Sequence, residues 1–547
     1  MMAIKLKIFQ DLKFIINKEE GIMIIIQWFI TLMVIFFIFS KKGNIEFLTK
    51  IQNLNKKFYY LIAIILVMVL LFLRYYKLAI IPLGTNIDEA GILYDSMLLS
   101  KTGFDRYNIS WPVYFNNYGR GMSAMYIYLN VILSMGRITL FKTRFIIASL
   151  SVIMALFAFL IIKRKYGIKY AVLGLFLITT LPYFVMASRW ALDCNLFVIV
   201  STFAIFFYLL AIENNKPYLY IFTGILFGSV LYTYALSYLV IPIFLLISLS
   251  FLLYRKKITV KSSLFLLIPI ILMAIPLLSF VAVNSGLINE FSFFNKFSVT
   301  KLIQYRKSEF SINNVINNLN LIKIYLFGVG FNFNVIDKFS TLYIFSSPII
   351  IYGIVLTARR LNQVKYDQDF ILLFFLISCV LVTLIIYIPN VSKSNQIYFS
   401  LVYFLIVGLK NLFDKNNLSL VLIPIYLIFS FIFSFYYFTD YSKSTPDLFE
   451  HDLYEVINYN EINNPDKLTF VDVGYNYAAN VPLLISLDLP SDYLYDNQIG
   501  NYDLIYSNEK NYDVYLIRSS NYIELEEKLI NDGYNINYHS GFTIYSK

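Results

Sequence analysis

Adjacent carboxylates, Asp88 and Glu89, follow closely after the apolar run Phe58 to Ile81, which is long enough to cross a bilayer. Lipid does not tolerate such a pair, and spanning a membrane does not require one. A carboxylate at this position can accept a proton, and a nearby cation can stabilise a phosphate. Further charged groups are expected at the outer ends of apolar runs, namely Arg106, Arg120, Arg189, Asp193 and Lys393. Together they indicate a reaction on a lipid-linked, negatively charged substrate at a membrane surface.

The composition indicates that membrane helices position these residues. Of the 547 residues, 59% are hydrophobic and only 14% are charged, which excludes an ordinary soluble globular protein. Repeated apolar runs of about 18 to 22 residues predict a polytopic α-helical membrane protein. The net charge of +11 is explained by basic cytoplasmic loops and does not require a nucleic-acid partner. Both histidines lie in the C-terminal tail, which excludes a histidine-built metal site in the membrane, and two distant cysteines predict no disulfide framework.

The apolar runs predict about twelve spans. They cover residues 22–40, 58–81, 145–162, 170–187, 196–212, 218–236, 238–254, 262–283, 341–358, 370–388, 397–409 and 418–438. Turns rich in Lys and Arg alternate with short turns that carry only Arg189 and Lys393, and the basic turns are expected to be cytoplasmic. This asymmetry places both termini, a first loop at 82–144 and a large loop at 284–340 on the outer side.

The first outer loop is predicted to contain two helices that do not cross the membrane. Met122 to Leu140 is apolar enough for a span, but a crossing there would move the basic turn at 163–169 to the outside. Arg137 also interrupts this run, so we expect it to lie along the outer interface. Ile87 to Leu99 has one apolar helical face, and Gly103 can cap its C-terminal end.

The composition becomes typical of a soluble domain after Thr439. Four segments are strand candidates, and one segment near Tyr522–Asn531 is a helix candidate. The strand candidates are Leu468–Val473, Asp503–Tyr506, Tyr512–Ile517 and Phe542–Tyr545. We expect a small α/β domain on the outer membrane surface.

Several segments, in this order, resemble membrane glycosyltransferases of the GT-C type. They are the Asp88-Glu89 pair, W-P-V-Y-F at Trp111–Phe115, A-M-Y-I-Y at Ala124–Tyr128, S-R-W-A-L-D-C-N-L at Ser188–Leu196 and Y-T-Y-A-L-S-Y at Tyr232–Tyr238. The sequence is similar to protein O-mannosyltransferases and to the aminoarabinose transferases of lipid A, a group related to glycosyltransferase family 39. The resemblance is strongest to their Gram-positive bacterial relatives and covers most of residues 58 to 440.

The resemblance implies an inverting glycosyltransferase at the outer face of a bacterial plasma membrane. Such an enzyme moves a hexose or pentose from a polyprenyl-phosphate donor to a glycan, lipid or protein acceptor. Asp88 matches the family's general base, and Glu89 is expected to orient the acceptor or Asp88. Membrane lipids are further partners, and nucleic acid is not. The loop has no DxD-type cluster, so no metal cofactor is expected to be obligatory, although this does not exclude a divalent metal.

With this resemblance, the chain divides into three predicted parts. Residues 1–57 form an extra N-terminal span and a basic cytoplasmic loop. Residues 58–440 form a GT-C-like transmembrane catalytic module, and residues 441–547 form the extracytoplasmic α/β domain.

Seven residues are expected to bind the donor phosphate or sugar. They are Arg120, Tyr126, Arg189, Asp193, Asn195, Tyr234 and Lys393. The sequence departs from its relatives at two cations: Met122 takes the place of a lysine, with Arg120 two residues earlier, and Lys393 takes the place of an arginine. A lysine offers a point charge instead of a planar fork. Which of Arg120, Arg189 and Lys393 binds the phosphate therefore stays open.

These residues also have structural explanations. Thr85 and Asp88 fit a helix capping box, and Arg189 and Asp193 fit an i,i+4 pair. Tyr234 fits a belt of interfacial tyrosines.

Two other classes of function remain. A flippase or exporter of lipid-linked glycans needs a polar path, which the uncharged spans lack. A non-catalytic scaffold that binds glycan leaves the carboxylate pair unexplained.

Overall fold

The computed structural model describes residues 18–41, 43, 55–118, 120–303, 311–319, 335–387, 389–441, 449–473, 480–490, 498–507, 509–518 and 520–547. The chain forms two compact units, each built from segments that are distant in sequence. The first unit comprises residues 1–76, 144–278 and 306–437. The second unit comprises residues 77–143, 279–305 and 438–547.

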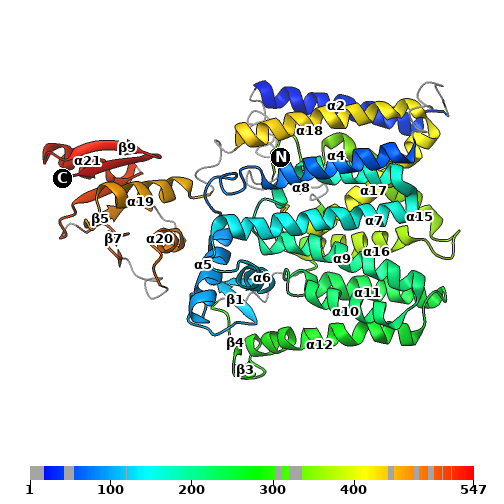
Figure 1. Ribbon diagram of the computed structural model, residues 1–547, viewed down its shortest axis with the longest axis horizontal. Helices are drawn as coiled ribbons and strands as arrows, with labels where there is room; N and C mark the ends of the chain where they lie inside the picture. Colours follow the sequence, from blue (N-terminus) through cyan, green and yellow to red (C-terminus); the bar gives the residue numbers. More distant parts are fainter. Residues whose placement is uncertain are drawn as a thin grey trace. The chain divides into compact units, whose positions relative to one another are not determined.

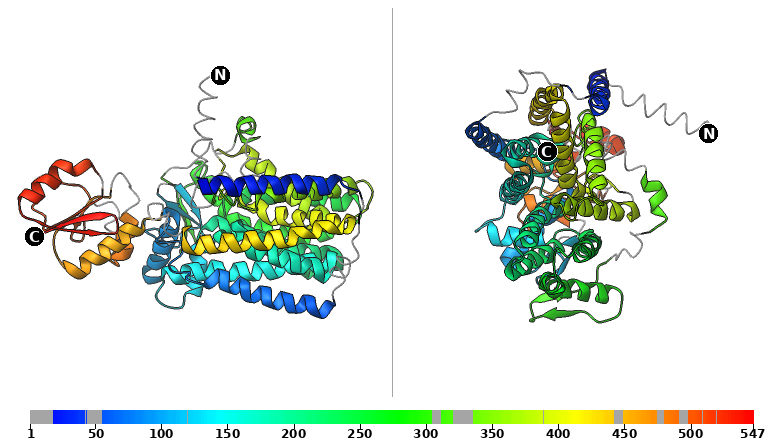
Figure 2. Two further views of the ribbon diagram at one scale, coloured as in Figure 1. Left: turned by 90° about the horizontal axis from the view of Figure 1, so that it is seen from above. Right: turned by 90° about the vertical axis from the view of Figure 1, so that its right-hand side faces the viewer.

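The first unit is a bundle of long apolar helices that run roughly parallel to one another (Figure 1). Figure 2 shows the same bundle from above and nearly end-on. Its helices are α2 (Lys18–Phe39), α4 (Lys56–Tyr75), α7 (Leu140–Thr180), α8 (Pro182–Ala187), α9 (Asp193–Asn214), α10 (Pro217–Val230), α11 (Ser237–Tyr254), α12 (Val260–Asn284), α13 (Asn314–Asn318), α15 (Ser347–Arg360), α16 (Gln368–Ile385), α17 (Tyr398–Lys415) and α18 (Leu422–Thr439). Short 3₁₀ turns are η2 (Ile344–Ser346), η3 (Asn395–Ile397) and η4 (Asn417–Val421). Within the described residues, nine helices are long and apolar enough to cross a membrane.

Each predicted span coincides with a described helix. Helix α7 contains the span 145–162 and, after a break at Gly167, the first part of the span 170–187, which continues in α8. The φ of 79° at the break suits glycine. A Cβ added to Gly174 would lie 2.4 Å from Cδ1 of Ile162, so the two halves pack against each other. Helices α10 and α15 have only 14 residues each, which makes them shorter than the predicted runs. The prediction of a polytopic helical membrane protein is therefore confirmed.

The second unit contains the first loop. Its elements there are α5 (Ile87–Thr102), β1 (Tyr114–Asn117), β2 (Arg120–Ser123) and α6 (Met125–Leu133), with the hairpin β3 (Phe291–Phe293) and β4 (Phe297–Val299) from the large loop. Helix α5 ends at Gly103, whose φ is 82°, as the sequence predicts. Helix α6 has nine residues, too few to span a membrane, which agrees with the expectation for 122–140.

The C-terminal part of the second unit is a small α/β arrangement. One sheet has the order β6-β7-β5-β8-β10-β9, in which β5 runs parallel to both β7 and β8. Its strands are β5 (Thr469–Val471), β6 (Gln498–Ile499), β7 (Tyr502–Asp503), β8 (Val514–Ile517), β9 (Asn535–His539) and β10 (Phe542–Ser546), and the helices are α19 (His451–Asn463), α20 (Asn480–Ser486) and α21 (Ile523–Asn531), with η8 (Ser520–Tyr522). Three of the predicted strands and the helix α21 are confirmed, whereas the predicted strand Asp503–Tyr506 overlaps β7 at Asp503 alone. The elements β6, β9, α19 and α20 are additional.

Helix α5 shares a hydrophobic core with this C-terminal sheet. Ala90, Tyr94 and Leu98 are buried in one cluster with apolar residues of α19, α20, β5 and β8. The hydroxyl of Tyr94 also donates to the carbonyl of Leu489 at 3.0 Å. The helix that carries the carboxylate pair is thus held in place by the last hundred residues of the chain.

Candidate active site

The first turn of α5 positions Asp88 and Glu89. Asn86 is the N-cap, and its side chain accepts a hydrogen bond from the backbone N–H of Asp88 at 3.0 Å. The predicted alternative, a capping box from Thr85, is therefore wrong. The Thr85 hydroxyl instead pairs with the hydroxyl of Tyr454 at 2.8 Å, which ties the segment before α5 to α19.

The carboxylates occupy different environments. Asp88 has an exposed side chain, whereas Glu89 is 0% exposed. Consecutive side chains of a helix point about 100° apart, which accounts for the difference. The geometry agrees with separate roles for the two residues, and the role of each remains a prediction.

A chain of side-chain contacts holds Asp88. Nδ2 of Asn117, at the end of β1, donates to Oδ1 of Asp88 at 2.7 Å. Oδ1 of Asn117 accepts from the guanidinium of Arg106 at 2.7 Å. Arg106 donates from Nε and Nη2 to Oδ2 of Asp95 at 3.2 and 2.9 Å, and both side chains of this ion pair are fully buried. The ion pair therefore fixes the orientation of the Asn117 amide, and Asn117 in turn restrains the carboxylate of Asp88.

Gly91 makes room for this chain. A Cβ at this position would lie 2.5 Å from Nη2 of Arg106 and 2.6 Å from Oδ1 of Asn117. A glycine inside a helix costs about 1 kcal/mol relative to alanine, so its presence here is explained by the close approach. Asp88, Gly91 and Asp95 follow a spacing of three and four residues, which places them on one face of α5.

The sequence reasoning missed Asp95 and Asn117, although this spacing was a signal for Asp95.

Charge and burial change the titration of neighbouring groups. Burial, and secondarily the negative charge of Asp95, raise the pKa of Asp105 to about 7. Oδ1 of Asp105 accepts hydrogen bonds from the backbone N–H groups of Tyr107 and Ile109. These bonds fix the turn at residues 105–109, which contains Arg106. The ring of Tyr118 covers the guanidinium of Arg106 at 4.9 Å from the ring centre, and burial raises the pKa of Tyr118.

In the first unit, Arg189 is buried and contacts the end of α4. Its guanidinium donates to the carbonyls of Leu73, Arg74 and Tyr76 at 2.9, 3.0 and 2.7 Å. Arg74 in turn donates to two carbonyls in the last turn of α7. Cations are favourable at helix C-termini, where carbonyl groups lack intrahelical partners. Arg189 thus caps the C-terminal end of α4, and its role in donor binding stays a prediction.

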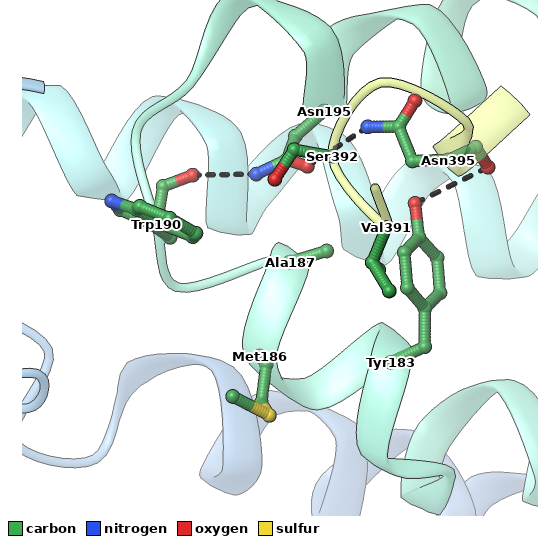
Figure 3. A pocket seen from close by; sticks show the side chains of 8 residues that line it. All are labelled: Tyr183, Met186, Ala187, Trp190, Asn195, Val391, Ser392 and Asn395. Carbon is green, nitrogen blue, oxygen red and sulfur yellow. Dashed lines mark hydrogen bonds between the residues drawn. The ribbon is translucent and has the colours of Figure 1, made fainter. Parts of the chain in front are cut away.

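The turns at 188–196 and 390–395 form one pocket (Figure 3). It is lined by Tyr183, Met186, Ala187, Trp190, Asn195, Val391, Ser392 and Asn395. Nδ2 of Asn395 donates to Oδ1 of Asn195 at 3.1 Å, and Nδ2 of Asn195 donates to the carbonyl of Trp190 at 3.0 Å. Buried Oδ1 of Asn395 has no hydrogen-bond partner among the described residues. The pocket therefore joins two segments singled out in the sequence.

The remaining predicted binding residues lie in varied settings. The half-buried Lys393 donates from Nζ to the carbonyl of Tyr387 at 3.1 Å. Asp193 begins α9 and accepts from the N–H of Cys194 at 2.7 Å. Tyr234 is half-buried in the turn between α10 and α11.

Two more of them belong to the second unit. Tyr126 is fully buried, and its hydroxyl donates to the carbonyl of Thr143 at 2.8 Å, while its role in donor binding stays a prediction. Arg120 begins β2, where it pairs with Asn117, and its side chain lies outside the described part.

The structure thus brings Asp88 together with Arg106 through Asn117, and Asn195 together with Asn395. The two groups belong to different units. Among the residues that the structure describes, no group of three or more His, Cys, Asp or Glu could hold a metal ion.

Comparison with solved structures identifies the fold. Two crystal structures of ArnT from Cupriavidus metallidurans, one bound to undecaprenyl phosphate and one in the apo state, have TM-scores of 0.53 and 0.54. The sequence identity is 10% in both, and the matches cover 89% and 88% of this chain and 97% of ArnT. The apo oligosaccharyltransferase of Archaeoglobus fulgidus is similar at a TM-score of 0.48 and 13% identity, over 79% of this chain and 64% of that chain. No protein-family model and no curated protein matches the sequence. The similarity to ArnT confirms the predicted GT-C fold.

Proposed function

We propose that the protein is an inverting glycosyltransferase that moves a sugar from a polyprenyl-phosphate donor to an acceptor, with Asp88 as general base. The observation that carries the proposal is the setting of Asp88, an exposed carboxylate restrained through Asn117 by a buried ion pair. The GT-C fold supports it, since ArnT, which shares that fold, was crystallised with undecaprenyl phosphate.

The reaction needs one proton acceptor and one stabilised leaving group. The acceptor oxygen forms a bond to the anomeric carbon from the face opposite the phosphate, and the bond from that carbon to the phosphate oxygen breaks. The acceptor proton passes to Asp88, and the polyprenyl phosphate leaves with the electron pair. A carboxylate has about four acceptor positions, so Asp88 can hold Asn117 and still receive this proton. A positioned base of this kind contributes on the order of 10²–10⁴-fold.

The leaving phosphate requires a cation, and we assign this role to Lys393. The guanidinium of Arg189 is engaged with three helix carbonyls. The half-buried Lys393 donates from its ammonium to the Tyr387 carbonyl and follows directly after Ser392, which lines the pocket of Asn195 and Asn395. Asn195 and Asn395 are proposed to contact the sugar, because Oδ1 of Asn395 can accept from a sugar hydroxyl.

The proposed site of action is the outer face of a bacterial plasma membrane, with residues 441–547 extracytoplasmic. The protein is a multi-pass membrane protein, and the distribution of Lys and Arg between its turns supports this orientation. The acceptor is proposed to be a glycan, a lipid or a protein that presents a hydroxyl there.

The test uses membranes that contain the full chain, supplied with labelled polyprenyl-phosphate sugars. Asp88→Asn should lower kcat at least a hundredfold while thermal unfolding of the purified protein is unchanged. The matched control is Asp488→Asn, because Asp488 is an exposed carboxylate of the same unit that pairs with Lys101 on the surface. Full activity of Asp88→Asn would refute the base assignment, and a wild type that consumes no labelled donor would refute the donor class.

A further inference from the structure

The second unit contains a cavity of about 550 Å³ that the proposed reaction does not use. Its walls are mostly apolar, and its polar lining comes from a few groups that differ in charge. The lining residues are Ala79, Ile80, Leu83, Gly84, Thr85, Leu93, Met97, Arg137, Ile138, Thr139, Leu140, His451, Tyr454, Glu455 and Ile485. A concave apolar space with a few convergent polar groups is typical of a binding site for a small amphiphilic molecule.

The cavity lies on the side of α5 that faces away from Asp88. Leu93 and Met97 line it, and they follow Asp88 by five and nine residues. At about 100° per residue these positions are turned by roughly 140° and 180° from Asp88 around the helix axis. Asp88 contacts Asn117 on its own side, so a molecule in the cavity would not meet the proposed base.

The cavity is formed by chain segments at the ends of two spans. Residues 79–85 follow directly after α4, which ends at Tyr75, and Leu140 is the first residue of α7. The same segments expose large apolar side chains: Ile80 is 54% exposed and Phe141, next to Leu140, is 46% exposed. Apolar surface on segments that continue directly from membrane helices favours contact with lipid chains.

The polar lining selects the headgroup. The exposed guanidinium of Arg137 can bind a phosphate with two parallel hydrogen bonds. The exposed carboxylate of Glu455, also in the lining, can accept a hydrogen bond from a donor in the same molecule. A phosphodiester that carries a hydroxyl or an amine meets both needs, whereas a polyprenyl phosphate has no such donor beyond its phosphate.

We propose that this cavity binds one bilayer phospholipid, with an acyl chain between Leu93, Met97 and Ile485 and the headgroup between Arg137 and Glu455. Gly84 and Thr85 line the cavity and lead into Asn86, the N-cap of α5. The bound lipid therefore fastens the start of α5 to α19 and stabilises the second unit. This inference does not depend on the proposed reaction, since it is read out by binding.

The test uses the full chain, purified in detergent, depleted of lipid and titrated with phosphatidylglycerol. Native mass spectrometry should show one retained phosphatidylglycerol per protein, and the midpoint of thermal unfolding should rise with lipid concentration. Arg137→Gln should weaken this binding at least tenfold, and Met97→Trp, which fills the cavity, should abolish it. Lys101→Gln is the matched control, because Lys101 is an exposed cation of α5 that pairs with Asp488 outside the cavity.

Three results would overturn the proposal. The first is retention of phosphatidylglycerol by Arg137→Gln at the wild-type level. This result would refute the proposal even if Met97→Trp fails to fold. The second is equal loss of binding in Lys101→Gln. The third is displacement of phosphatidylglycerol by an equimolar amount of undecaprenyl phosphate, which would make the cavity a site for the carrier lipid.

Discussion

Removal of Asp95 should destabilise the second unit strongly, because Arg106 would keep a buried charge without a counter-charge. The side chains of both residues are 0% exposed, and Arg106 makes three hydrogen bonds to the carboxylate, at 3.2, 2.9 and 3.1 Å. Breaking a buried pair of this kind costs about 3–5 kcal/mol. This is a large part of the 5–15 kcal/mol that is typical of a folded domain. Asp95→Ala should therefore lower the midpoint of thermal unfolding in detergent markedly.

The double variant Asp95→Leu with Arg106→Met separates stability from positioning. Replacing a buried ion pair by apolar side chains of similar volume is neutral or stabilising by up to about 4 kcal/mol. The double variant should thus unfold near the wild-type temperature. It also removes the guanidinium that donates to Oδ1 of Asn117. The orientation of the Asn117 amide is then no longer fixed, which weakens its hydrogen bond from Nδ2 to Asp88.

A hydrogen bond to a charged group contributes about 1.5–3 kcal/mol, which corresponds to a loss of roughly 10–100-fold in rate. The assay is transfer from labelled polyprenyl-phosphate sugar at saturating donor. The reasoning is refuted if the folded double variant transfers sugar at the wild-type rate, or if Asp95→Ala unfolds at the wild-type temperature.

Other substitutions test single features. Gly91→Ala should lower the unfolding temperature, because the added methyl group would lie 2.5 Å from Nη2 of Arg106. Alanine in place of glycine usually stabilises a helix by about 1 kcal/mol, so a rise in the unfolding temperature would contradict the close packing. Asp105, whose pKa is raised by burial from 3.8 to about 7, binds a proton in the folded protein that the unfolded chain releases, so it makes stability fall as the pH rises from about 4 to 7. Asp105→Asn should flatten that part of the profile of unfolding temperature against pH, and an identical profile would argue against the raised pKa. Arg189→Gln should lower the unfolding temperature, whereas Lys393→Gln should raise KM for the donor and leave the unfolding temperature unchanged. The reverse pattern would make Arg189 the phosphate-binding residue and Lys393 the structural one.

The spans and the helix α5 could be predicted because each depends on a local pattern. Apolar runs of sufficient length mark the spans, and the apolar face that ends at Gly103 marks α5. The partner of that face could not be predicted. Tyr94 and Leu98 look like residues for a membrane interface, yet they pack on α19 and α20, which lie in a distant part of the sequence.

The contacts around the candidate site depended even more on tertiary structure. Asn117 and Asp88 are 29 residues apart, and an asparagine side chain gives no periodic signal. Arg189 appeared to pair with Asp193 because the two are four residues apart. Its observed partners include three backbone carbonyls more than a hundred residues earlier, and every residue type has a backbone carbonyl. Sequence patterns identify charged groups, whereas unsatisfied helix ends become visible only when helices are packed.

The contact between Tyr94 and Leu489 joins residues that are 395 positions apart, and that between Thr85 and Tyr454 joins residues 369 apart. During synthesis, α5 emerges early, whereas the segments that bury it emerge after the last membrane helix has been made. Helix α5 therefore lacks the C-terminal part of its hydrophobic core until the whole bundle has been synthesised. A chain released before this point lacks the residues of α19, α20 and the C-terminal sheet that bury one face of α5.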